Sequence, residues 1–260
     1  MRAVSAVRCA LRLALLSAVL VAASGCATVP SGAVASKDDP WESFNRNVFV
    51  FNDKVDEAVL KPIATVYRDV VPQIVRTGIG NVLSNIGDVW STANHLLQGK
   101  IHSALDSGLR VAVNTLMGLG GLLDPATEMG LTRQREDFGQ TLGRWGVGSG
   151  PYLVLPFLGP STLRDAGALV LDSKFSPSSL PPTDKGTYSV LALEVIDLRA
   201  GLLDSSRLLN DVALDKYTFL RQAFLARRLD QVHDGSPPLE AFVDDGAEPA
   251  PPAPVRPAPK

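Results

Sequence analysis

The chain is built from short amphipathic segments in which apolar residues recur every three or four positions, and glycine or proline interrupts each segment before it becomes long. This period is that of an α-helix with one apolar face. The segments lie at about 41–61, 72–99, 101–116, 161–170, 190–203 and 214–232. None holds 18 uninterrupted apolar residues, so none is expected to span a bilayer as a simple helix. The sequence therefore predicts an all-α fold of several amphipathic helices.

The pattern leaves open what the apolar faces contact. A stripe that packs against its neighbours in a soluble bundle has the same period as one that lies in, or lines a path through, a membrane. The charge composition excludes one class of binding partner. With 25 Lys and Arg against 27 Asp and Glu, the formal net charge is −2, so we expect no nucleic-acid partner.

The first 25 residues have the parts of a secretory signal peptide: three arginines, an apolar run at 13–23, and small residues. They end at Ala23-Ser24-Gly25-Cys26, which resembles the lipobox of bacterial lipoproteins, although alanine is less usual than leucine at its first position. That resemblance implies cleavage before Cys26 and acylation of this residue, which becomes the lipid anchor. The alternative is an ordinary secretory signal followed by an incidental cysteine.

Cysteine usage agrees with an anchor at Cys26. The other cysteine, Cys9, lies in the segment that is removed, so no intrachain disulfide is possible afterwards. Two or more acyl chains give stable membrane anchoring. Ala27 follows the anchor, and by resemblance to enterobacterial lipoproteins a residue other than Asp there implies sorting to the outer membrane.

The chain divides into four parts on these signals. Residues 1–25 are the signal peptide, 26–38 a linker, 39–233 the folded body, and 234–260 a tail that carries eight of the 19 prolines. Proline and alanine at this density favour an extended, solvated tail. A segment that crosses the cell wall or binds a partner is the alternative for the tail.

Several helix boundaries can be predicted. Asp39 is expected to cap a helix that begins with Pro40 and ends before Pro62. Ser161 is expected to cap a later helix, with Asp165 in its first turns. The residues between 173 and 187 read as a polar loop.

Glycine is concentrated in the middle of the chain. Residues 118–150 hold nine of the 22 glycines, which gives this region the composition of a hinge. The apolar run at 148–160 follows and contains three prolines, so neither a long helix nor a central strand fits it.

A search for catalytic chemistry finds little. The three histidines, His95, His102 and His233, have no accompanying metal-ligand pattern, so neither a metal nor a cofactor is expected. Ser149 lies between glycines but lacks the register of a nucleophile elbow. A hydrolase triad of Ser149 with His95 or His102 is the remaining enzymatic alternative.

Ordered blocks through the body together resemble the MlaA (VacJ) family of outer-membrane lipoproteins, over about residues 38–230. These blocks are 39–46, 68–72, 97–99, 114–121, 138–143, 146–152, 155–157, 162–165 and 202–204.

The resemblance implies a ring of amphipathic helices that lies in the membrane leaflet around a central hydrophilic channel. It implies transport of mislocalised phospholipids from the outer leaflet of the outer membrane, with no enzymatic activity. The implied partners are phospholipids, a trimeric outer-membrane porin and a soluble periplasmic lipid carrier of the Mla system. A scaffold that organises porins without moving lipid is the alternative function, and a phospholipase is the enzymatic one.

The resemblance also implies roles for individual residues. Gly146, Gly148 and Gly150 are expected to act as a hinge beside the channel, the alternative being positive φ or tight packing without movement. The residues expected to line the channel or form its lip are Phe138, Tyr152, Leu155 and Phe157.

Overall fold

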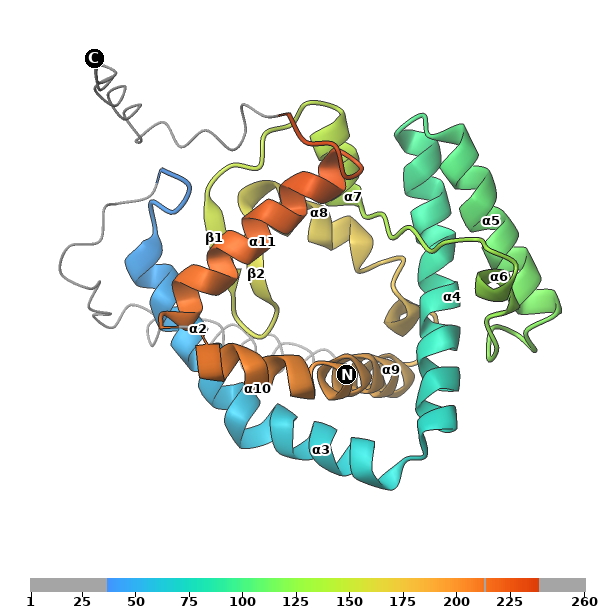
Figure 1. Cartoon of the computed structure of the whole chain (residues 1–260), viewed down its shortest axis with the longest axis horizontal. Coiled ribbons are helices and arrows are strands. Elements are labelled where there is room, and N and C mark those ends of the chain that lie inside the picture. Colours follow the sequence, from blue (N-terminus) through green and yellow to red (C-terminus); the bar gives the residue numbers. More distant parts are fainter. Residues whose placement is uncertain (1–36, 213, 239–260) are drawn as a thin grey trace, which may run out of the picture.

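The computed structural model describes residues 37–212 and 214–238 (Figure 1). The signal peptide, Cys26, most of the linker and most of the tail lie outside the described residues. The helices run from Glu42 to Val232, and the all-α prediction is confirmed apart from one two-stranded hairpin.

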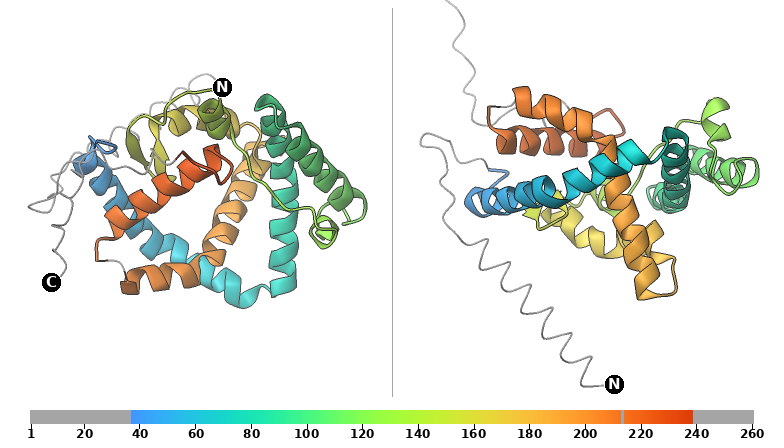
Figure 2. Two further views of the ribbon diagram at one scale, coloured as in Figure 1. Left: turned by 45° about the horizontal axis from the view of Figure 1, so that its top comes forward. Right: turned by 90° about the horizontal axis from the view of Figure 1, so that it is seen from below.

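The elements follow one another around an open centre (Figure 1). They are α2 (Glu42–Val55), a π-helical turn η1 (Asp56–Leu60), α3 (Lys61–Val70), α4 (Gln73–Leu97), α5 (Ile101–Leu116), α6 (Pro125–Glu128), α7 (Phe138–Arg144), β1 (Tyr152–Leu155), β2 (Gly159–Thr162), α8 (Leu163–Asp172), the 3₁₀ turn η2 (Pro177–Ser179), α9 (Asp184–Gly201), α10 (Leu203–Val212) and α11 (Lys216–Val232). Seen from the edge, α9 projects from one face of the ring (Figure 2).

The predicted cap of the first helix is wrong. α2 begins at Glu42, and Trp41 occupies its N-cap position without a side-chain bond. Asp39 is instead 2% exposed and accepts hydrogen bonds from Asn45 Nδ2 at 2.8 Å and Arg221 Nη1 at 2.9 Å. The carboxylate of Asp39, which the sequence pattern predicts to be a helix cap, therefore forms a long-range ion pair with Arg221.

Pro62 does not end the helix, contrary to the prediction. The chain passes through η1, where the Lys61 N–H bonds to the Asp56 carbonyl five residues earlier, and continues as α3. A π-helical turn widens the helix and shifts its hydrogen-bond register, which lets Pro62 sit in the first turn of α3, where its missing N–H costs little. The helix ends at Val70, and Val71, which precedes Pro72, is already extended.

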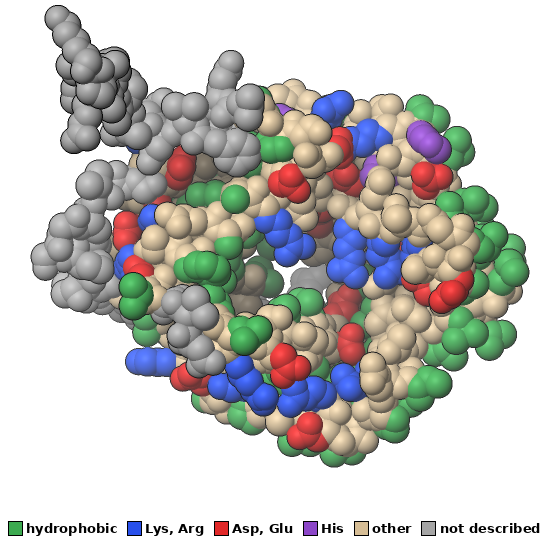
Figure 3. Space-filling view, in the orientation of Figure 1, with side chains coloured by type: hydrophobic (Ala, Val, Ile, Leu, Met, Phe, Trp, Pro, Cys, Tyr) green, Lys and Arg blue, Asp and Glu red, His purple; other side chains and the backbone are tan. Residues whose placement is uncertain are grey.

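The predictions for 72–99 and 101–116 are confirmed by α4 and α5, which form an antiparallel pair. Their amphipathicity is inverted relative to a soluble bundle. α5 buries Ser107, Arg110 and Asn114 while its apolar residues Ile101, Leu105, Leu109 and Leu116 are each at least half exposed. α4 likewise buries Asn85, Asp88, Ser91, Asn94 and His95 and exposes Val75, Val89, Leu96 and Leu97. Figure 3 shows the apolar side chains gathered along the outer edge over α5 and α6.

The apolar run at 148–160 forms the hairpin β1–β2, with Tyr152 paired to Thr162 and Leu155 to Gly159. Both strands are edges, so a proline in β2 is tolerated. α2 lies along β1 and completes it: Asn45 bonds to the Tyr152 carbonyl at 3.0 Å and accepts from the Val154 N–H at 2.9 Å. Buried Val48, Tyr152, Val154 and Tyr217 form the small core beneath this contact.

Two further boundaries differ from the predictions. Thr162, not Ser161, caps α8 by accepting from the Asp165 N–H at 3.2 Å. The expected polar loop contains η2, and α9 begins at Asp184 because Thr183 caps it. Within the described part of the chain, no helix combines the length and apolar character needed to cross a membrane.

Candidate functional site: a polar cavity inside the helical ring

A cavity of about 490 Å³ lies at the centre of the ring. The space-filling view shows it as a hollow bordered by charged side chains (Figure 3). Its wall is formed by α4, the segment before α7, the end of α8, α9 and α11. The charged residues of this wall are Asp88, Arg135, Glu136, Asp137, Asp172, Glu194, Asp197 and Arg227.

Most carboxylates of this wall already have partners. Asp88 bonds to Arg133 Nε at 3.0 Å, Glu136 to Lys100 Nζ at 3.1 Å, and Asp197 accepts from the Tyr67 hydroxyl at 3.0 Å. The two cations of the wall differ from them. Arg135 donates only to the Ser84 hydroxyl, at 3.0 Å, and Arg227 is exposed, and neither forms an ion pair with another described residue. Arg135 and Arg227 can therefore bind an anionic group in the cavity.

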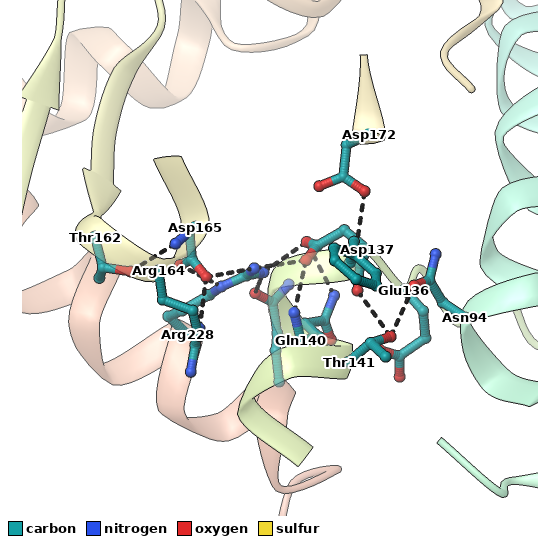
Figure 4. A network of polar contacts seen from close by, with 12 residues as sticks. Asn94, Glu136, Asp137, Gln140, Thr141, Thr162, Arg164, Asp165, Asp172 and Arg228 are labelled. Carbon is teal, nitrogen blue, oxygen red and sulfur yellow. Dashed lines mark hydrogen bonds and ion pairs between the residues drawn. The ribbon is translucent and has the colours of Figure 1, made fainter. Parts of the chain in front are cut away.

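A bidentate ion pair fixes one side of the cavity (Figure 4). Arg228 on α11 donates two hydrogen bonds of 2.6 Å to Asp137, which precedes α7, and bonds of 2.8 and 3.1 Å to Asp165 on α8. Burial opposes ionisation of Asp137, but Arg228 outweighs it and holds the pKa of Asp137 below its usual value. Three helices are therefore joined at one guanidinium.

Asp137 also caps α7, because it accepts from the Gln140 N–H at 2.8 Å. Gly139, in the first turn, allows Arg228 to approach: a Cβ there would lie 2.5 Å from Arg228 Nη2 and from Asp165 Oδ1. Glycine is required here by space, since its φ is not positive.

Two carboxyls of the wall are less acidic than usual. Burial raises the pKa of Asp172, although Trp90 Nε1 at 2.7 Å and the Phe138 N–H at 2.9 Å donate to it. Burial likewise raises the pKa of Glu194 beside Ser178. Asp172 is thus held in the wall by donors from two elements, α4 and the start of α7.

A second polar cluster holds the α4–α5 pair to the segment around α6. Arg110 is 1% exposed and contacts both oxygens of Asp124 at 3.0 Å, and Asn114 donates to the same carboxylate at 2.8 Å. Burial alone would raise the pKa of Asp124, but hydrogen bonds from Thr127, Asn114 and Arg110 lower it to about 2. This cluster takes the place of an apolar core between α5 and the segment around α6.

The three predicted hinge glycines lie in the loop between α7 and β1. Gly146 and Gly150 have φ of +90° and +65°, whereas φ of Gly148 is not positive and a Cβ there would meet no atom within 4 Å. Gly146 and Gly148 border a separate cavity of about 530 Å³ against Leu229 and Val232 of α11. The loop therefore has open space beside it, and its movement remains a prediction.

None of the four predicted lining residues borders the central cavity. Tyr152 is 1% exposed in the hydrophobic core, so it has no surface to present to a channel. Phe138 is half-buried and contacts Trp145 edge-on at 6.1 Å, and Leu155 borders a smaller cavity of about 200 Å³. Phe157 is 66% exposed at the hairpin tip, where it contacts Phe51 at 5.2 Å.

The cavity is lined by polar residues of the predicted helices, by the charged residues 135–137, and by the apolar residues Leu83, Trp90, Phe175, Pro177 and Leu198. The helical periodicity of α4 could have identified Ser84 and Asp88, since both lie opposite its apolar stripe. The sequence around Glu194 and Arg227 does not predict that these residues line a cavity, because the orientation of their helices depends on packing. No hydrogen bond joins Ser149 to His95 or His102 in the described residues; His95 is buried in α4 and His102 is exposed.

Amphipathic helices that enclose a polar cavity and turn apolar residues outward define a class of all-α proteins suited to a lipid environment. The comparisons with known proteins make the class specific. The family model for "MlaA lipoprotein" matches residues 37–231. The chain belongs to the MlaA lipoprotein family.

Named relatives cover most of the chain. It is 36% identical over 246 residues to the Intermembrane phospholipid transport system lipoprotein MlaA of Escherichia coli K12, which spans 90% of this chain and 94% of that protein. The protein of the same name from Haemophilus influenzae is 32% identical over 229 residues, 85% of this chain and 90% of that one. A solved structure concerned with the structural basis for maintenance of bacterial outer membrane lipid asymmetry superposes with a TM-score of 0.65 at 38% identity, over 75% of this chain and 100% of that one.

Proposed function

We propose that this chain moves phospholipids through the central cavity, removing misplaced ones from the outer leaflet of the outer membrane and passing them to a soluble periplasmic carrier. The observation that carries the proposal is the inverted amphipathicity of α4 and α5. Exposed leucines outside and buried arginine, aspartate and asparagine inside are stable only if the outside contacts something apolar. The names of the relatives, which place them in an intermembrane phospholipid transport system, support the same substrate.

The cavity suits a phospholipid headgroup. Every glycerophospholipid carries an anionic phosphate, and the cavity wall includes Arg135 and Arg227, which form no ion pair with another described residue. Asp88 and Glu136 of the same wall are already paired with Arg133 and Lys100, so they repel the phosphate less than their number suggests. The acyl chains remain outside, among the apolar residues.

The exposed apolar residues and the expected acyl anchor both support a location in the membrane. Exposed Ile63, Val66 and Val70 on α3 continue the apolar rim formed by α4 and α5. With the expected acyl anchor at Cys26, the ring would lie in the periplasmic leaflet of the outer membrane. A trimeric porin is the proposed partner at its outer rim, and Gly146, Gly148 and Gly150 are the proposed hinge beside the passage.

The test compares cells that lack the gene with cells complemented by wild type or a variant. Wild type should lower the amount of phospholipid accessible in the outer leaflet, whereas Arg135→Glu combined with Arg227→Glu should not. Arg207→Glu on α10, which is 62% exposed and outside the cavity wall, is the control for a charge reversal away from the cavity. If deletion leaves the outer-leaflet composition unchanged while porin organisation is disturbed, the protein is a scaffold and the proposal fails.

A further inference from the structure

A second, apolar groove of about 540 Å³ lies outside the central cavity, between the α4–α5 pair and the segment 174–180. Its apolar wall includes Ile86 and Val89 of α4, Val111 of α5 and Leu180. Val89 and Leu180 are 56% and 63% exposed, so the groove opens to the surroundings. Its volume falls in the range of about 300–1,000 Å³ typical of small-molecule sites.

One aromatic pair separates this groove from the polar cavity. Trp90 and Phe175 border both spaces, and their rings stack at 4.1 Å with an angle of 5° between them. Trp90 is held in place by its hydrogen bond of 2.7 Å to Asp172. A molecule in the groove would therefore lie directly against the wall of the headgroup cavity.

The groove has a cation at its edge. Lys174 is exposed, and in the described part of the chain it forms no ion pair; no carboxylate is among the residues that line this groove. An apolar floor with one cation at its end matches an acyl chain joined to a phosphate. A soluble peptide partner would find few groups here for its backbone hydrogen bonds.

We propose that this groove binds one acyl chain of the phospholipid, with the phosphate at Lys174 and the Trp90–Phe175 stack as the partition between tail and headgroup. The inference rests on the proposed function and deepens it. It assigns a lateral site at which a lipid waits before its headgroup enters the cavity. Burial of methylene groups against Ile86, Val111 and Leu180 supplies the affinity, and Lys174 supplies the preference for a phospholipid.

Tryptophan fluorescence tests the site directly. The sequence has three tryptophans, so Trp41→Phe with Trp145→Phe leaves Trp90 as the reporter in the full-length acylated protein. Phosphatidylglycerol with bromine atoms on its acyl chains, added in dodecylmaltoside micelles, should quench Trp90. Leu180→Glu should weaken this quenching about tenfold, because it places a charge on the apolar floor. Leu208→Glu on α10, at a residue 67% exposed, is the matched control and should leave quenching unchanged.

Two further arms separate the lipid from any other apolar tail. Dodecylmaltoside with a brominated chain should quench Trp90 less strongly, and Lys174→Gln should reduce the preference for phosphatidylglycerol by about fivefold, the effect of one cation beside an anionic lipid. Val111→Phe, which fills the groove with apolar atoms, should also reduce quenching and needs no buried charge. Equal quenching in Leu180→Glu and Leu208→Glu, or equal quenching by the two brominated amphiphiles, overturns the proposal.

The outcomes for the two proposals differ. If wild type restores lipid asymmetry in cells and brominated phosphatidylglycerol does not quench Trp90, the groove proposal fails and the proposed function stands. If Trp90 is quenched as expected and asymmetry is not restored, the proposed function fails while the binding site is supported.

Discussion

Arg228 donates a 2.6 Å hydrogen bond to each carboxylate oxygen of Asp137, and this pair joins α11 to the beginning of α7. The contact is almost entirely buried on the arginine side, where the side chain is 11% exposed. It sets the position of the charged segment that forms one side of the central cavity. The ring is thus closed by an ion pair where a soluble bundle would use apolar packing.

Removal of Arg228 should destabilise the fold strongly. Arg228→Met leaves Asp137 without its guanidinium partner and leaves Asp165 with Arg164 alone. We expect the free energy of unfolding to fall by about 3–5 kcal/mol, as for other broken buried pairs. Urea denaturation followed by circular dichroism in detergent measures it. Arg227→Met, at the neighbouring exposed residue, should change stability by less than about 0.5 kcal/mol. Similar losses for both variants would contradict the assignment.

Acid should weaken the cluster around Asp124. The pKa of this carboxyl is about 2 in the folded protein against 3.8 for the ordinary group, so the unfolded state binds the proton more tightly. Its stabilisation is therefore complete above about pH 5 and is lost as the pH falls from 4 toward 2. Because the side chain keeps 19% exposure, we expect on the order of 1–2 kcal/mol.

Asp124→Asn provides the comparison for that pH dependence. Unfolding midpoints in urea between pH 6 and 3 should fall more steeply for wild type than for the variant. Parallel curves would show that Asp124 is not the group responsible.

Alanine should destabilise the protein at Gly139 and have little effect at Gly148. A Cβ at Gly139 would collide with Arg228 and Asp165, so Gly139→Ala should lower the free energy of unfolding by about 1–3 kcal/mol. At Gly148 the space is open and φ is not positive, so Gly148→Ala should be nearly neutral.

The bulkier Gly148→Val extends this comparison to the proposed hinge. It should keep expression and thermal stability while reducing lipid transport in complemented cells. Loss of expression would assign Gly148 a structural role instead.

The outward leucines of α5 should determine membrane association apart from the anchor. In a Cys26→Ala protein, which cannot be acylated there, Leu105→Glu with Leu109→Glu should reduce co-flotation with phosphatidylglycerol vesicles by about tenfold or more. Both leucines are at least half exposed, so the fold should be retained. Unchanged flotation would show that this face does not meet lipid.

Much of the local structure can be predicted from the sequence. Glycine and proline determined the ends of α4 and α5, and the predicted limits agree with the observed ones. One prediction failed because a tertiary partner competed with a local one: Asp39 binds Arg221 in place of capping α2. Another failed because a local feature was not foreseen: the π-helical turn η1 carries the helix through Pro62.

The site was harder to predict, because the sequence does not specify the direction in which each side chain points. Blocks that match a family identify Tyr152 and Leu155 as notable residues, yet say nothing about which way their side chains point. Tyr152 faces the core, and the cavity wall comes from Asp88, Arg135 and Arg227 on segments distant in the sequence.

The helical period, the near balance of charge and the family follow from the amino-acid sequence, because period and family blocks depend on residue order and net charge depends on composition. Whether an apolar stripe faces inward or outward was decided only by the tertiary structure. A period of 3.6 residues is identical for both orientations. On α5 the choice is made by Arg110 and Asn114, which bond to Asp124 at the N-cap of α6 and thereby turn the leucines outward.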